Sequence, residues 1–184
     1  MKLHFKVMGL VIAVSTVLTA CGGGGGGSPP TTTTPTTTTP TATIEETIRT
    51  LEMSGKLPTL DRSASIVGPD TNANGVRDDV DAYIAKQGYT APQLKSVQQI
   101  AKAQADILLV DIGNQDALRS SDLSLQKSIN CVFSKFPDTG QSAVVIKNIE
   151  KITANTKARV EKYIKYQIAM NGKVLASPQG DTCE

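Results

Sequence analysis

The sequence has little of the chemistry on which most enzymes depend. Its 184 residues include no tryptophan, three cysteines and one histidine, His4, which lies in an N-terminal stretch that we expect to be removed. A mature chain without histidine cannot hold a Ser-His-Asp or Cys-His catalytic site, or an imidazole metal ligand. We therefore expect a protein that is not an enzyme. The competing class is a hydrolase that uses paired carboxylates, such as Asp78 with Asp79 or Asp106 with Asp111.

The N-terminal apolar stretch is too short to cross a bilayer. It covers residues 7–18, or 12 residues, whereas a spanning helix needs about 20. Lys2 and Lys6 precede it, and Leu18-Thr19-Ala20-Cys21 follows it. These features resemble the signal peptide and lipobox of bacterial lipoproteins, which implies cleavage after residue 20 and acylation of Cys21.

That resemblance also implies a location. A lipid-modified Cys21 would hold the protein on a membrane of the cell envelope. Because Gly22 rather than an aspartate follows it, we expect the outer membrane, at its periplasmic face or at the surface, rather than the inner one. Cleavage would also remove Lys2 and Lys6, leaving 17 basic and 17 acidic side chains. This balance gives no reason to expect nucleic acid as a partner.

Residues 21–43 have the composition of a tether. A glycine run is followed by threonine runs separated by prolines, with no large apolar side chain that could form a core. Such a segment is flexible at its glycines and extended at its prolines. We expect it to act as a spacer between the anchor and a folded domain of residues 44–184.

That domain is predicted to be all-α, an irregular antiparallel bundle of about five helices. The predicted helices cover about 43–53, 76–87, 90–112, 116–136 and 141–171. Capping boxes mark two starts, Thr43 with Glu46 and Thr90 with Gln93. On the last helix we expect the apolar residues Val145, Ile149, Ile152, Val160, Tyr163 and Ile164 to face the core. Its lysines, Lys147, Lys151, Lys162 and Lys165, either form a solvated face or contact an anionic partner.

One stretch of the domain resembles the calcium loop of the EF-hand and dockerin families. Oxygen-bearing side chains recur in the pattern DxNxNG, and a glycine, Gly75, stands where the chain must turn sharply. The resemblance implies side-chain ligands at positions 1, 3, 5, 9 and 12 and a backbone carbonyl at position 7. The implied ligands are Asp70, Asn72, Asn74, Val76, Asp78 and Asp81.

Two departures from the family pattern shape the prediction. Position 12 is Asp81 rather than glutamate, which weakens calcium binding or improves the fit to Mg²⁺. Gly68-Pro69 precedes Asp70, so no regular helix can lead into the loop. We therefore expect half an EF-hand with a structural Ca²⁺. The alternatives are a calcium-regulated adaptor, or an Asx-rich turn that binds no metal.

The two remaining cysteines, Cys131 and Cys183, are expected to form a disulfide, because paired cysteines are usual in exported proteins. The bridge would fasten the polar C-terminal tail to the fourth helix. Two free thiols or a redox pair are the alternatives. Taken together, the sequence predicts an anchored calcium-binding domain with a binding or scaffolding role. Its partner would be an unidentified envelope protein or polysaccharide.

Overall fold

A computed structural model describes residues 42–173 and 177–184. The expected signal peptide (1–20), the acylated Cys21 and nearly all of the expected tether (21–43) lie outside this part of the chain. The described residues form six helices and contain no strand, which confirms the all-α prediction. None of these helices is long and apolar enough to span a bilayer.

The first helix, α1 (Ile44–Met53), begins at the predicted capping box. The Thr43 amide donates to Glu46 Oε2 at 2.8 Å, and the Glu46 amide donates to Thr43 Oγ1 at 3.2 Å. Each of two otherwise unpaired amides at the helix start thus gains an acceptor. None of the side chains of α1 is fully buried.

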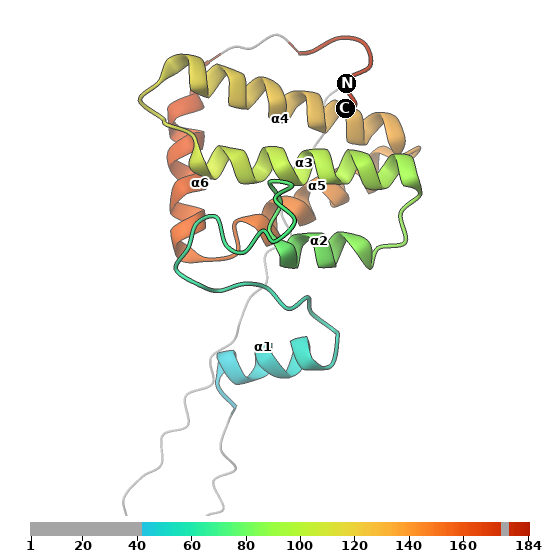
Figure 1. Ribbon diagram of the computed structural model, residues 1–184, viewed down its shortest axis with the longest axis vertical. Coiled ribbons are helices and arrows are strands. Elements are labelled where there is room, and N and C mark those ends of the chain that lie inside the picture. Colours follow the sequence, from blue (N-terminus) through green and yellow to red (C-terminus); the bar gives the residue numbers. More distant parts are fainter. Residues whose placement is uncertain (1–41, 174–176) are drawn as a thin grey trace, which may run out of the picture. The chain divides into compact units, whose positions relative to one another are not determined.

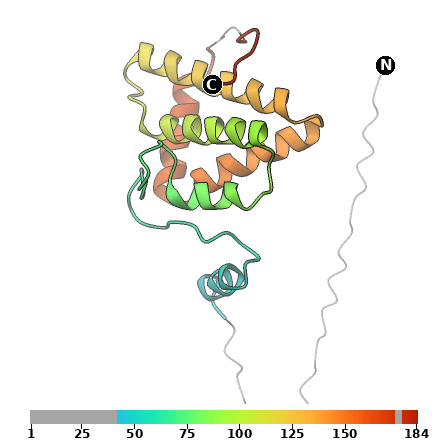
Figure 2. The same ribbon diagram turned by 45° about the vertical axis from the view of Figure 1, so that its right-hand side comes forward.

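The bundle is built around α3 (Ala91–Leu109), which packs against α2 (Asp78–Ala85), α4 (Gln115–Lys135), α5 (Thr139–Thr153) and α6 (Lys157–Met170). Figure 1 shows α4 running antiparallel beside α3, with α6 crossing their ends. The capping box at Thr90 is confirmed, because the Thr90 amide donates to Gln93 Oε1 at 3.1 Å. Figure 2 shows α5 and α2 below α3, so that α3 is covered from several sides.

The core consists mainly of aliphatic side chains from α2, α3, α4 and α5 and from residues next to these helices, supplied largely at helical spacing. Its main members are Val76, Val80, Ile84, Val97, Ile100, Val132, Phe136, Val145 and Ile149. A second cluster of Ile107, Leu118 and Tyr166 lies where α6 meets α3 and α4. Val76 and Val80 therefore join the candidate metal loop directly to the main core.

The prediction of one long helix over 141–171 is wrong. The chain forms α5 and α6, separated at 154–156, and α6 begins where Thr156 Oγ1 accepts the Arg159 amide at 3.3 Å. After the break, the side of the helix that faces the core no longer follows the apolar spacing of α5. Arg159 and Tyr166 face inward, while Val160 and Ile164 are 40 % and 48 % exposed. These two side chains are therefore not core residues, contrary to the expectation from a continuous helix.

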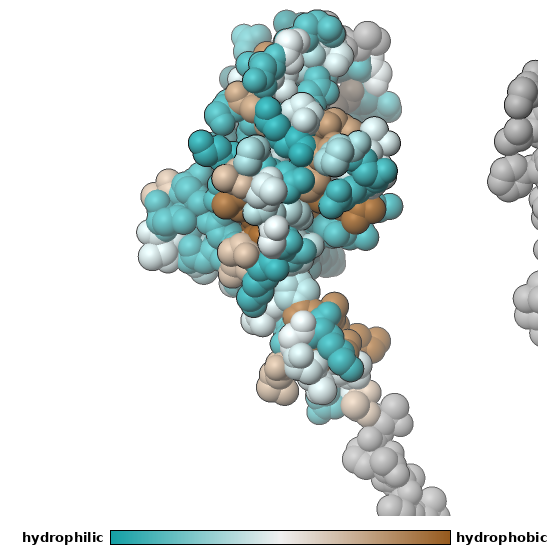
Figure 3. Space-filling model, turned by 90° about the vertical axis from the view of Figure 1, so that its right-hand side faces the viewer, coloured by the Kyte–Doolittle hydropathy of each residue, from teal (hydrophilic) through white to brown (hydrophobic). Residues whose placement is uncertain are grey.

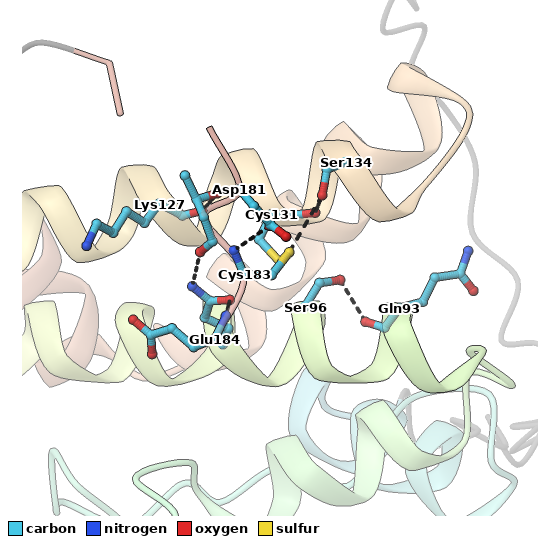
Figure 4. The surroundings of a disulfide bond; sticks show 10 residues. Gln93, Ser96, Lys127, Cys131, Ser134, Asp181, Cys183 and Glu184 are labelled. Atoms are coloured by element: carbon cyan, nitrogen blue, oxygen red, sulfur yellow. Dashed lines mark hydrogen bonds between the residues drawn. A yellow bond between two sulfur atoms is a disulfide. The ribbon is translucent and has the colours of Figure 1, made fainter. Parts of the chain in front are cut away.

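The predicted disulfide joins Cys131 of α4 to Cys183 of the C-terminal tail, with the Cα atoms 4.9 Å apart. Figure 4 shows the tail lying between α3 and α4 at this bridge. Thr182 Oγ1 donates to the Lys127 carbonyl at 2.8 Å, and Gln99 Nε2 donates to the Thr182 carbonyl at 3.0 Å. The tail is thus fastened to both helices.

Candidate metal centre

The candidate loop is closed at its base by one backbone hydrogen bond. The Asp78 amide donates to the Pro69 carbonyl at 2.9 Å, which joins the residue before the loop to the first turn of α2. Gly68 has φ +70°, and a Cβ there would lie 2.3 Å from Arg77 Cδ. Glycine is therefore required at this position both by the backbone conformation and by the closeness of Arg77.

Within the loop, the Asp70 carboxylate organises the backbone. Its Oδ1 accepts the Asn74 amide at 3.1 Å and its Oδ2 accepts the Gly75 amide at 2.9 Å. The chain can approach Asp70 in this way because Ala73 (φ +55°) and Gly75 (φ +82°) both adopt left-handed conformations. The sharp turn that the sequence predicted at Gly75 is present.

The side chains at positions 3, 5 and 12 meet on the same side of the loop. Asn72 Nδ2 and Asn74 Nδ2 donate to Asp81 Oδ2, at 3.2 Å and 2.7 Å. The second oxygen of that carboxylate, Asp81 Oδ1, is buried and has no hydrogen-bond partner among the described residues. A buried carboxylate oxygen without a donor is unfavourable, and a bound cation is one means of satisfying it.

The remaining two expected ligands have other partners or other roles. Asp78 Oδ1 accepts the Thr71 amide at 2.9 Å, and Asp78 Oδ2 accepts the Thr71 hydroxyl at 2.7 Å. These donors hold the pKa of Asp78 below its usual value. The Val76 side chain is buried in the core, which fixes its backbone at the edge of the loop. The structure thus joins Asp70, Asn72, Asn74 and Asp81 into one network and directs Asp78 to Thr71.

The donor set suits a hard cation but is poor in charge. Among the described residues, no three His, Cys, Asp or Glu side chains are grouped so that they could hold a metal ion. A metal here would therefore depend on asparagine and backbone oxygens in addition to carboxylates. Ca²⁺ accepts neutral oxygens of this kind, with six to eight ligands at about 2.4 Å. The loop residues fit Ca²⁺ in chemistry, and the scarcity of charge points to modest affinity.

A surface hollow borders the open side of the loop. It is lined by Asn72, Asn74 and Asp81 from the loop and by Tyr89, Leu94 and Gln98 from the start of α3 and the turn before it. An ion could therefore reach the Asp81 carboxylate from solvent without opening the core.

Two buried arginines, Arg77 and Arg159, hold the segment that leads into the loop. Their burial was not predicted from the sequence. Arg77 donates through Nη2 to Asp79 Oδ2 at 2.9 Å and to the Ile152 carbonyl at 2.8 Å, near the end of α5. Asp79 also accepts the Asp61 amide at 2.6 Å. Arg77 and Asp79 therefore connect the start of α2 to the end of α5 and to the segment that precedes the loop.

Arg159 is fully buried and binds the same segment through both arms of its guanidinium group. It donates to the Asp61 carboxylate at 2.6 Å and to the Asp61 and Ser65 carbonyls at 2.8 and 2.7 Å. Its guanidinium lowers the pKa of Asp61 to about 2. In the sequence these arginines resemble ordinary surface charges. Their role appears only in the folded chain, where Arg77 reaches the Ile152 carbonyl and Arg159 reaches the Asp61 carboxylate, 75 and 98 residues away.

The carboxylate pairs considered for hydrolysis are separated by their partners. Asp78 contacts Thr71 whereas Asp79 contacts Arg77. Asp106 pairs with Lys102 at 3.2 Å, and Asp111 Oδ1 accepts the Gly113 amide at 2.9 Å. Neither pair directs two carboxylates at one point.

In comparisons with known proteins, no family model, curated protein or solved structure matches the chain.

Proposed function

We propose that the chain is a lipid-anchored protein of the cell envelope whose helical domain holds one structural Ca²⁺ in the loop Asp70–Asp81. In this proposal Cys21 attaches it to the outer membrane, and the domain binds an envelope protein or polysaccharide without catalysing a reaction. The anchoring rests on the resemblance of residues 1–21 to lipoprotein signals. The metal site rests on the sequence pattern together with the geometry of the loop.

The observation that carries the calcium proposal is the buried, unpartnered Asp81 Oδ1. It belongs to the one carboxylate on which Asn72 and Asn74 already converge. A turn that bound no metal would need the Asx side chains only as local caps. Such a metal-free turn would give no reason to bury a carboxylate oxygen of Asp81, at position 12 of the loop. When bound, Ca²⁺ would supply positive charge at that oxygen, while Asp70 keeps the loop backbone in place.

The surroundings of the loop support a structural role. Val76 and Val80 are core residues, and Arg77 binds the end of α5. An ion in the loop would therefore stabilise the junction of α2 and α5. The competing adaptor role requires a second arrangement of the helices that calcium would favour. Small-angle scattering with and without calcium separates the two, because a structural site leaves the scattering curve unchanged.

Thermal unfolding tests the metal site. The mature chain with Cys21→Ser, in its oxidised form, would be melted in EDTA, in Ca²⁺ and in Mg²⁺. A ligand of the folded state stabilises it by about 2.7 kcal/mol at 100 times its dissociation constant. We expect millimolar Ca²⁺ to raise the unfolding midpoint by several degrees. Mg²⁺ is the competing ion, because the short Asp81 arm suits it.

The variant Asp81→Asn sharpens the test. We expect it to lose the calcium-induced rise, yet to melt in EDTA at or above the wild-type midpoint, because it removes the charge from a carboxylate whose Oδ1 is buried and has no hydrogen-bond partner among the described residues. The exposed Asp116→Asn is the matched control and should keep the wild-type response. An unchanged midpoint in all three solutions would refute the metal site, and an intact calcium response in Asp81→Asn would place it elsewhere.

A further inference from the structure

A small cavity lies between α3 and the segment that leads into α2. It measures about 90 Å³. On α3, Ala101 and Ala105 are one helical turn apart and share a face, and their short side chains leave space that larger residues would fill. The apolar walls of the cavity are formed by Ile66, Val76, Val80, Ala101, Ala105 and Leu108.

The cavity is bordered by one buried polar side chain whose hydroxyl has no partner. Thr153, the last residue of α5, lines the cavity and is 5 % exposed. Its Oγ1 is buried and makes no hydrogen bond to any of the described residues. A threonine hydroxyl can both donate and accept, and leaving it unpaired in the interior is unfavourable. An occupant of the cavity with a hydrogen-bonding group would satisfy it.

The charged side chains at the cavity already have partners within the chain. The Arg77 guanidinium donates to the Asp79 carboxylate at 2.9 Å. Asp106 forms a salt bridge within α3, at 3.2 Å. Both oxygens of Asp70 accept backbone amides of the loop. Because these charges are paired or hydrogen-bonded, the cavity suits an occupant that carries no charge.

The edge of the cavity is apolar where it meets solvent. Val67 and Leu109 line it and are 55 % and 53 % exposed. On the face of the domain that Figure 3 shows, hydrophobic side chains likewise form small patches among hydrophilic ones. An opening bordered by two apolar side chains suits a small molecule better than a protein, whose interface buries about 800 Å² on each side.

We propose that this cavity binds a short, uncharged aliphatic molecule with one hydrogen-bonding group, which pairs with Thr153 Oγ1. The volume sets the size of the ligand. An apolar cavity of about 150 Å³ holds benzene, so a cavity of about 90 Å³ holds a chain of about four non-hydrogen atoms. Binding of this ligand does not depend on the metal site.

Nuclear magnetic resonance of the ¹⁵N-labelled mature chain with Cys21→Ser, oxidised and in EDTA, tests the proposal. The probe is 1-propanol, which has the required length and one hydroxyl. We expect saturable shifts at millimolar concentration, confined to the amides of residues that line the cavity. Propionate is charged and benzene is too large, so each should bind at least tenfold more weakly.

Two variants test the two parts of the site. Ala105→Leu fills the cavity and should abolish the shifts. Thr153→Val keeps the shape of the side chain and removes the hydroxyl, so it should weaken 1-propanol about fivefold and leave 1-chloropropane, which cannot donate, unchanged. The exposed Thr139→Val is the matched control and should bind both probes as the wild type does.

Shifts that rise linearly with 1-propanol, or that spread over the surface, would overturn the proposal. So would a cavity that holds water alone, with water contacts to its amides that 1-propanol does not displace. Because Thr153→Val preserves the shape of the residue, it remains informative even if Ala105→Leu fails to fold. Equal loss of 1-propanol and 1-chloropropane in Thr153→Val would refute the role of the hydroxyl.

Discussion

The C-terminal tail and the segment between α1 and α2 are both irregular, yet they are fastened to the helices by different means. The tail, residues 177–184, is joined covalently through Cys131–Cys183 and by a few neutral hydrogen bonds. The α1–α2 segment, residues 54–77, is held by the buried Arg77 and Arg159 and their carboxylate partners. A covalent attachment does not depend on pH or on metal ions under conditions in which the domain stays folded. The attachment by charges is sensitive to acid, and under the calcium proposal the segment also responds to metal ions.

The largest expected effect comes from removing the charge that holds the α1–α2 segment. Arg159→Met leaves the Asp61 carboxylate without its main partner, and breaking a buried ion pair costs about 3 to 5 kcal/mol. Urea unfolding would measure the loss, with the exposed Arg119→Met as the control. A loss below about 1 kcal/mol would show that the segment is held by other contacts.

Removing the covalent attachment of the tail should cost somewhat less. Cys131 and Cys183 are 52 residues apart, and closing such a loop contributes about 4 kcal/mol in the chain-entropy description, with 2 to 4 typical. We expect the double variant Cys131→Ala/Cys183→Ala to lower the free energy of unfolding by this amount. The loss should be the same in calcium and in EDTA. A loss that depended on calcium would show that the tail and the loop are coupled.

Acid should loosen the α1–α2 segment and spare the tail. Because the folded pKa of Asp61, about 2, lies below its ordinary value of 3.8, the ionised form stabilises the fold. That stabilisation is present above the ordinary pKa and is lost as the pH falls through about 4 towards 2. It amounts to about 2 kcal/mol. Urea unfolding over this range should show a flatter pH dependence in Asp61→Asn than in the wild type. Equal slopes would contradict this account.

Features set by neighbouring residues could be predicted from the sequence. The capping boxes at Thr43 and Thr90 depend on a residue three positions away, and both are present. The pairing of Cys131 with Cys183 was predictable because only two cysteines remained once Cys21 was assigned to the lipid. The turn at Gly75 likewise follows from local chemistry.

Features that depend on distant partners could not be predicted. Apolar spacing continued across residues 154–156, and the signal for a break was the cap at Thr156, which lacks a capping-box partner. The break allows Arg159 to reach Asp61, 98 residues away in sequence. Arginine is rarely buried unless it is paired, so its burial could not be foreseen before the partner was placed. The partner of Asp78 was also not predicted, although Thr71 is close in sequence, because Thr71 is not a position of the calcium-loop pattern.

The central claim, that the loop Asp70–Asp81 holds an ion, is tested most directly by equilibrium dialysis of the mature chain with Cys21→Ser against radioactive calcium. We predict about one ion per chain, with a dissociation constant of about 10⁻⁵ to 10⁻³ M. Binding should be lost in Asp70→Asn and Asp81→Asn and kept in Asp116→Asn. Absence of bound calcium at millimolar concentration, or equal binding by all of these variants, would contradict the account.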